Sequence, residues 1–238
     1  MNSFATWFGL RNTASLTDQQ QERLDRLPAP APLGEQPLLE QRFVVVDVET
    51  TGLHLNRDQI LSIGAVVIDQ GGIPLSQQFE RTLLREYRDP GPSVLIHGIA
   101  PSEIAAGDEP TEVLLDFLEF VGESPLLAFH ARFDQQMLSR AFKDSLGYKL
   151  RHPFLDLAEM APMLCPQLGK PQTGLDEWME LFGLQVQQRH NACADALVSA
   201  ELALVLFNRA TRQEIATVGR LAERMRSWRR RQDATSFL

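Results

Sequence analysis

One stretch, Phe43–Gly52 (FVVVDVETTG), constrains the fold more than any other part of the chain. Phe43–Val48 is rich in Val, with charge before it and a Thr-Thr-Gly turn after it, which predicts a strand buried on both faces. Because side chains alternate along a strand, Asp47 and Glu49 share one face, about 7 Å apart by the strand rise. Two buried carboxylates repel each other and lose the free energy of hydration. A bound hard divalent cation usually compensates for both costs. A strand that ends at Val46, with both acids solvated, explains this stretch equally well.

The rest of the chain predicts an α/β protein with a mixed five-stranded sheet whose first strands are antiparallel and whose faces are flanked by helices. The expected strands are Phe43–Val48, Gln59–Asp69, Pro74–Leu84, Pro125–Phe129 and Phe154–Leu155. The expected helices are Thr17–Leu27, Thr111–Val121, a helix after Phe129 to about Leu146, Asp156–Leu164, Leu175–Phe182 and Asn191–Arg209. Residues 85–110, which contain four prolines, are expected to form an irregular loop.

Three segments are expected along the chain. Residues 1–42 form an N-terminal appendage that ends in a Pro-rich linker, residues 43–210 form the main domain, and residues 211–238 form a basic helix or tail. The arginines of that tail are Arg220, Arg224, Arg226, Arg229, Arg230 and Arg231. One explanation is that these cations lie at a solvated helix end, where the helix dipole favours them. The other is that they bind a phosphate backbone or an acidic partner.

Composition excludes several classes of protein. Lys and Arg total 23 against 31 Asp and Glu, and this net charge of −8 argues against broad, salt-driven binding of duplex DNA. The two cysteines, Cys165 and Cys193, are too few for a disulfide framework or a zinc quartet, so a reducing cytoplasm fits. No apolar run approaches the roughly 20 residues of a membrane span, so we expect no membrane insertion. The first residues also lack the apolar core of a signal peptide.

Two further carboxylates lie on helix faces that otherwise look buried. Asp134 shares a stripe with Met137 and Leu138, and Asp195 shares one with Val198. Either acid alone could simply be a first-turn residue that the helix dipole favours. Four inward-facing acids together, counting Asp47 and Glu49, make that explanation much weaker.

His190 lies five residues before Asp195, just ahead of the last of these helices. A lone histidine in a loop usually has no special role. Beside a cluster of carboxylates, its near-neutral pKa makes it a candidate general base.

At this point the chain resembles a known family. Three motifs carry the resemblance: Asp47–Gly52 (DVETTG), Phe129–Asp134 (FHARFD) and His190–Asp195 (HNACAD). Ile96–Ile99 (IHGI) and the segment Leu175–Leu184 match further elements in the expected order. From Phe43 to Arg209 the chain resembles the DEDD-type 3′–5′ exonucleases of the histidine subclass and is similar to the proofreading subunit of bacterial DNA polymerase III. In one departure, Phe129-His130 stands where the family often has His-Asn.

The resemblance implies a ribonuclease H-like fold and a site that binds two Mg²⁺ or Mn²⁺ ions. The implied metal ligands are Asp47, Glu49, Asp134 and Asp195, with His190 as the general base; four carboxylates suffice to hold two such cations. The implied contacts to the terminal nucleotide are Thr50, Thr51, Gly52, His97 and Phe133.

The expected activity is release of nucleoside 5′-monophosphates from nucleic-acid 3′ ends, of the DNA proofreading or repair type. The expected partners are single-stranded 3′ ends, and a polymerase or other protein bound through the N-terminal segment or the basic tail. Two alternatives stay open: an RNA-directed exoribonuclease, and a non-catalytic module that binds a polymerase or nucleic acid.

Overall fold

The computed structural model describes residues 16–85, 98–185 and 190–235 of the 238-residue chain. Its sheet has five strands in the order β3-β2-β1-β4-β5. Their bounds are β1 Phe43–Thr50, β2 Ile60–Ile68, β3 Gln78–Thr82, β4 Leu126–Ala128 and β5 Phe154–Asp156. β2 is antiparallel to both of its neighbours, β1 and β3, whereas β1, β4 and β5 are parallel. The predicted mixed α/β sheet with antiparallel first strands is therefore confirmed.

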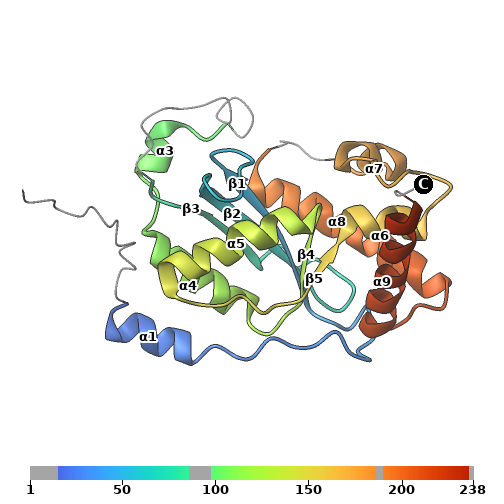
Figure 1. Ribbon diagram of the computed structural model, residues 1–238, viewed down its shortest axis with the longest axis horizontal. Coiled ribbons are helices and arrows are strands. Elements are labelled where there is room, and N and C mark those ends of the chain that lie inside the picture. Colours follow the sequence, from blue (N-terminus) through green and yellow to red (C-terminus); the bar gives the residue numbers. More distant parts are fainter. Residues whose placement is uncertain (1–15, 86–97, 186–189, 236–238) are drawn as a thin grey trace, which may run out of the picture.

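Helices cover both faces of this sheet (Figure 1). Their bounds are α1 Asp18–Asp25, α3 Pro101–Ala105, α4 Pro110–Val121, α5 Ala131–Leu146, α6 Leu157–Leu164, α7 Leu175–Phe182, α8 Ala192–Arg212 and α9 Val218–Thr235. On one face, Val44 and Val46 of β1 pack with α4 and α5. On the other, Phe43 and Val45 pack with α6, α8 and α9. Since β1 is central and buried on both sides, its alternating side chains hold the two layers together.

Two expectations for local structure were wrong. Within the expected loop at 85–110, Pro101–Ala105 is helical, because Pro101 is preset for a first helical position and the Glu103 carboxylate accepts a hydrogen bond from the Ala100 N–H. The expected third strand began at Pro74, but β3 begins at Gln78. Pro74 is instead the first residue of a turn that its carbonyl closes by accepting from the Gln77 N–H.

Helix α1 lies against α4 through a cluster of charges. The Arg23 guanidinium forms ion pairs of 2.6–2.8 Å with three α4 carboxylates, those of Glu112, Asp116 and Glu119. Because these pairs are partly exposed, each contributes at most about 1 kcal/mol, but together they fix where α1 sits.

The segment after α1 runs along one edge of the molecule to the start of α9 (Figure 1). There the Gly219 N–H donates to the Gly34 carbonyl at 2.6 Å, and the Leu38 N–H donates to the Ala216 carbonyl at 2.9 Å. Leu38 itself is buried in the core beneath α8. The division of the chain after residues 42 and 210 stays a prediction.

One side of helix α9 is part of the core, and the other side is exposed to solvent. Leu221 and Met225 are buried in the same core as α6 and α8, and Trp228 packs against it. Among the described residues, no helix combines the length and apolarity that crossing a membrane requires.

Candidate active site

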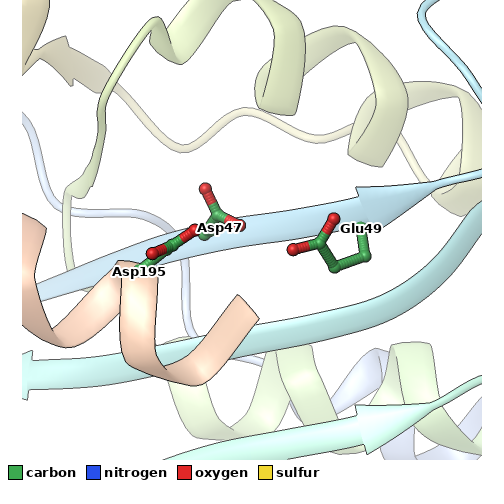
Figure 2. A group of neighbouring side chains, drawn as sticks. All are labelled: Asp47, Glu49 and Asp195. Atoms are coloured by element: carbon green, nitrogen blue, oxygen red, sulfur yellow. The ribbon is translucent and has the colours of Figure 1, made fainter. Parts of the chain in front are cut away.

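Three of the predicted acids converge at the carboxyl end of β1. Asp47 and Glu49 project from β1, and Asp195 projects from the first turn of α8 (Figure 2). One carboxylate oxygen from each lies within 4.8 Å of the others. Asp195 is buried, and Asp47 and Glu49 are half-buried. Such a group of hard oxygen donors has the chemistry of a divalent cation site.

The fourth acid, Asp134, enters the same pocket from α5. It is only 4% exposed, and it lies outside the group of three. Burial raises the pKa of the Asp134 carboxyl well above its usual range, and the neighbouring charge of Asp47 raises it further. Hydrogen bonds from the backbone of Asp134 and Val48 offset part of this effect. A positive charge between Asp134 and Asp47 would relieve their repulsion.

His190 lies at the mouth of the pocket, directly before α8. Its backbone is left-handed, with φ of 61°, and its N–H donates to the Asp195 Oδ2 at 3.0 Å. Asn191 caps α8 by accepting from the Ala194 N–H at 2.9 Å. The main chain of His190 thus helps to orient Asp195, while its exposed side chain lines the pocket.

The pocket around these acids has a volume of about 560 Å³. Its lining residues are Asp47, Val48, Glu49, Leu53, Phe129, His130, Phe133, Asp134, Leu175, His190 and Asp195. Carboxylates therefore form its floor, and apolar and aromatic side chains form much of its wall. Leu53 was not predicted from the sequence; it is 84% exposed although it is large and apolar. The one sequence feature that could have identified Leu53 as a pocket residue is its position as an apolar residue directly after the Thr-Thr-Gly turn.

The turn after β1 lies beside this pocket rather than within it. The Thr50 hydroxyl donates to the Gly52 carbonyl at 2.8 Å, and the Thr51 hydroxyl donates to Asp58 at 3.3 Å. Thr51 and Gly52 line an adjoining hollow that Leu53 shares. Thr50 lines neither space. His97 lies outside the described residues.

The departure at Phe129-His130 has a conformational explanation. His130 has φ of 61° and precedes the first residue of α5, so this position requires the left-handed backbone that Asn and His tolerate better than most residues. The Asp156 carboxylate accepts from the His130 N–H at 3.0 Å and from the Ala158 N–H at 2.9 Å, which places α5 relative to α6. Burial raises the pKa of Asp156. Asp156 is also the N-cap residue of α6.

Comparison with known proteins agrees with this geometry. Residues 44–203 match the exonuclease family. The chain belongs to that family. The matched range begins at β1 and ends within α8, so it contains all four acids of the candidate site.

Similar proteins include subunits and domains of bacterial replicative polymerases. The DNA polymerase III subunit epsilon of Aquifex aeolicus is 30% identical over 165 residues, which cover 69% of this chain and 80% of that protein. The epsilon subunit of Treponema pallidum is 32% identical, with 67% and 74% covered. The PolC-type DNA polymerase III of Thermotoga maritima is 35% identical, but the match covers only 12% of it.

Among solved structures, Escherichia coli exonuclease I in complex with a dT13 oligonucleotide has a TM-score of 0.59 at 21% identity. The match covers 73% of this chain and 42% of that one. A second complex, with a 5cy-dT13 oligonucleotide, has a TM-score of 0.60 at the same identity. These likenesses establish the ribonuclease H-like exonuclease fold.

Proposed function

We propose that the protein is a metal-dependent 3′–5′ exonuclease of the histidine subclass, which releases nucleoside 5′-monophosphates from nucleic-acid 3′ ends. The observation that carries this proposal is the approach of Asp47, Glu49 and Asp195 within 4.8 Å, beside the buried Asp134. Membership in the exonuclease family supports hydrolysis of phosphodiester bonds. A merely structural domain would gain nothing from gathering acids that repel one another.

The donor set fits hard divalent cations, because every candidate ligand is a carboxylate and two of them are almost fully buried. Asp47, Glu49 and Asp195 would hold one Mg²⁺ or Mn²⁺, and Asp134 with Asp47 would hold a second. When bound, such ions supply a more acidic attacking water and stabilise charge on the leaving oxygen.

The residues around the acids have separate tasks in this proposal. His190 takes the proton of the attacking water, since its exposed side chain reaches the pocket beside Asp195. The apolar wall of Leu53 and Phe133 holds the terminal base and sugar. The backbone of the Thr50–Gly52 turn, together with His97, is proposed to hold the terminal nucleotide and its 3′ hydroxyl. Bound cations would offset the negative charge of the nucleic-acid substrate. An acidic protein can therefore bind this polyanion at the site.

DNA is the proposed substrate and proofreading or repair the proposed role, because the similar chains include epsilon subunits of a DNA polymerase. A polymerase is correspondingly a proposed partner, bound through the N-terminal segment or α9. A cytoplasmic location is proposed because Cys165 and Cys193 are free, buried thiols, which suit a reducing compartment.

The experiment uses the full chain with single-stranded DNA, single-stranded RNA and duplex DNA labelled at the 5′ end. We expect stepwise shortening from the 3′ end with Mg²⁺ or Mn²⁺ and complete loss of activity in EDTA. Faster cleavage of RNA than of DNA would favour the exoribonuclease alternative. Activity that survives EDTA, or shortening from 5′ ends, would refute the proposal.

A further inference from the structure

A second, smaller pocket lies between α5 and the loop that follows β1. Its volume is about 210 Å³, and its lining residues are Asn56, Arg57, Gln59, Ile60, Arg85, Met137, Arg140, Ala141, Asp144 and Ser145. Three arginines face a single carboxylate there, in a protein whose net charge is −8. This pocket is therefore positive where the chain as a whole is negative.

Two of the arginines are held in place by backbone carbonyls rather than by acids. The Arg85 Nε donates to the Ile60 carbonyl at 3.1 Å, and the Arg140 guanidinium donates to the Leu55 carbonyl. Among residues 16–85, 98–185 and 190–235, no carboxylate forms an ion pair with either guanidinium. Both side chains are only partly exposed. The Arg140 guanidinium also lies 3.9 Å from the Met137 Sδ. Because arginine carries five N–H donors, each guanidinium keeps donors that bond no other group among the described residues.

The two guanidinium groups are close enough to repel each other. Burial lowers the pKa of Arg85, and the charge of Arg140 lowers it further, although Glu109 offsets part of the effect. Like charges that are partly removed from water are unfavourable unless an anion joins them. A phosphate group is such an anion, and arginine binds it in a fork geometry.

The arginine pocket also lies near the active-site pocket. Arg140 lies on α5 six residues after Asp134, which corresponds to about 9 Å along the helix axis. The loop at residues 51–58 separates the two pockets: Leu53 lines the active-site pocket, and Asn56 and Arg57 line the arginine pocket. A strand whose 3′ end occupies the acidic pocket and whose chain crosses this loop brings its upstream phosphates toward Arg85 and Arg140.

We propose that the arginine pocket binds a backbone phosphate of the strand being digested, upstream of the bond that is cleaved. This inference rests on the proposed exonuclease function. It assigns to Arg85 and Arg140 a role in gripping the strand, and it explains how an acidic protein retains a polyanionic substrate between successive cuts.

The test measures binding of a 5′-fluorescent single-stranded oligonucleotide in EDTA, where cleavage stops, across a range of salt concentrations. The double variant Arg85→Gln/Arg140→Gln is expected to bind about tenfold more weakly. Its slope of log affinity against log salt should fall by about 0.7, the value for one phosphate on a single strand. The double variant Arg85→Lys/Arg140→Lys keeps the charges and should keep most of that slope. Arg26→Gln, on exposed α1, controls for the loss of charge elsewhere.

A purely structural role of Arg85 and Arg140 predicts a different pattern of affinities and salt slopes. If the Lys and Gln double variants lose affinity equally, or if the slope of the Gln variant is unchanged, the arginines only support the loop and the proposal is wrong. Should the double variants fail to fold, Arg57→Gln gives the same readout, because Arg57 lines the pocket and its side chain is 77% exposed. A wild-type protein that degrades no strand at all refutes the exonuclease function itself, whereas an active enzyme with an unchanged slope refutes only the phosphate pocket.

Discussion

Asp47 and Gly64 lie directly opposite each other in the antiparallel pairing of β1 with β2. A Cβ atom at Gly64 would lie 2.1 Å from the backbone of Ala192 and Cys193, at the start of α8. The missing side chain therefore allows the first turn of α8 to rest directly on the sheet. That close approach is what brings Asp195 beside Asp47.

Gly64→Ala is expected to push the start of α8 off the sheet, since the clash involves backbone that cannot rotate away. The overpacking should cost about 1–3 kcal/mol of unfolding free energy and should weaken Mn²⁺ binding. Denaturant unfolding and titration calorimetry measure both. Gly72→Ala is the matched control, because its Cβ would meet nothing closer than 3.8 Å. Wild-type affinity for Mn²⁺ in Gly64→Ala would show that the contact does not position Asp195.

The proposed roles of Asp47 and His190 predict different kinetic losses. Asp47→Ala should weaken metal binding and abolish activity together. His190→Ala should leave metal binding nearly intact and lower the single-turnover rate about 10²–10⁴-fold, the usual contribution of a general base. Calorimetry with Mn²⁺ beside rapid-quench rates separates the two. Loss of metal binding in His190→Ala would contradict its role as a base.

Asp134 predicts an unusual dependence of stability on pH in the absence of metal. Burial and Asp47 raise its pKa above the ordinary 3.8, so the folded protein favours the protonated carboxyl. Protonated Asp134 therefore stabilises the folded protein fully at pH values below its pKa in the unfolded chain. This stabilisation is lost as the pH rises through the pKa of Asp134 in the folded protein. In EDTA at neutral pH, Asp134→Asn should therefore raise the Tm, and this advantage should shrink toward pH 4.

The control for this measurement is Asp144→Asn, on the exposed part of the same helix. It should change the Tm little at any pH. With Mg²⁺ present, the wild type should have a higher Tm than Asp134→Asn, because the ion stabilises the wild type and does not stabilise this variant. A lower Tm of Asp134→Asn in EDTA would mean that the ionised carboxylate is stabilised in the folded state.

Helix α9 provides a test of the predicted phosphate grip by the basic tail. Arg220, Arg224, Arg226 and Arg230 are exposed, as are Arg231 and Arg229, of which Arg229 pairs with Glu159 at 2.8 Å. Replacing Arg220, Arg224, Arg226 and Arg230 by Gln should reduce the salt slope for long single strands by about 0.7 for each phosphate released. Cleavage of dinucleotides should barely change.

Substitution is the appropriate experiment here, because deletion of α9 would uncover Leu221 and Met225, which are buried in the core. Arg229→Gln is the comparison variant: it should lower stability slightly through loss of its ion pair and leave the slope nearly unchanged. An unaltered slope in the fourfold variant would leave the helix dipole or a protein partner as the explanation for these arginines.

The sequence predicted those parts of the site that depend on local periodicity. Alternation along β1 placed Asp47 and Glu49 on one face, and helical spacing turned Asp134 inward. The role of Gly64 could not be predicted, because it depends on a contact with α8, far away in sequence. Leu53 was missed for a related reason: an exposed apolar residue in a turn has no periodic signal.

Segments whose structure depends on capping and turn chemistry were the least predictable. Several prolines favoured an irregular loop at 85–110, yet one of them, Pro101, starts a helix because Glu103 caps it. The positive pocket combines Arg85, which follows β3, with Arg140 on α5. Neither residue belongs to a motif, so only the three-dimensional structure brings them together.

The hydrogen bonds from Gly219 to Gly34 and from Leu38 to Ala216 join stretches from nearly opposite ends of the chain. Contacts between residues so distant in sequence close the largest loops and are expected late in folding. During synthesis the segment around Gly34 leaves the ribosome early, but Gly34 and Leu38 can form these two hydrogen bonds only after Ala216 and Gly219 have been made. Complete docking of this segment therefore requires translation through the start of α9, which comes after every acid of the candidate active site.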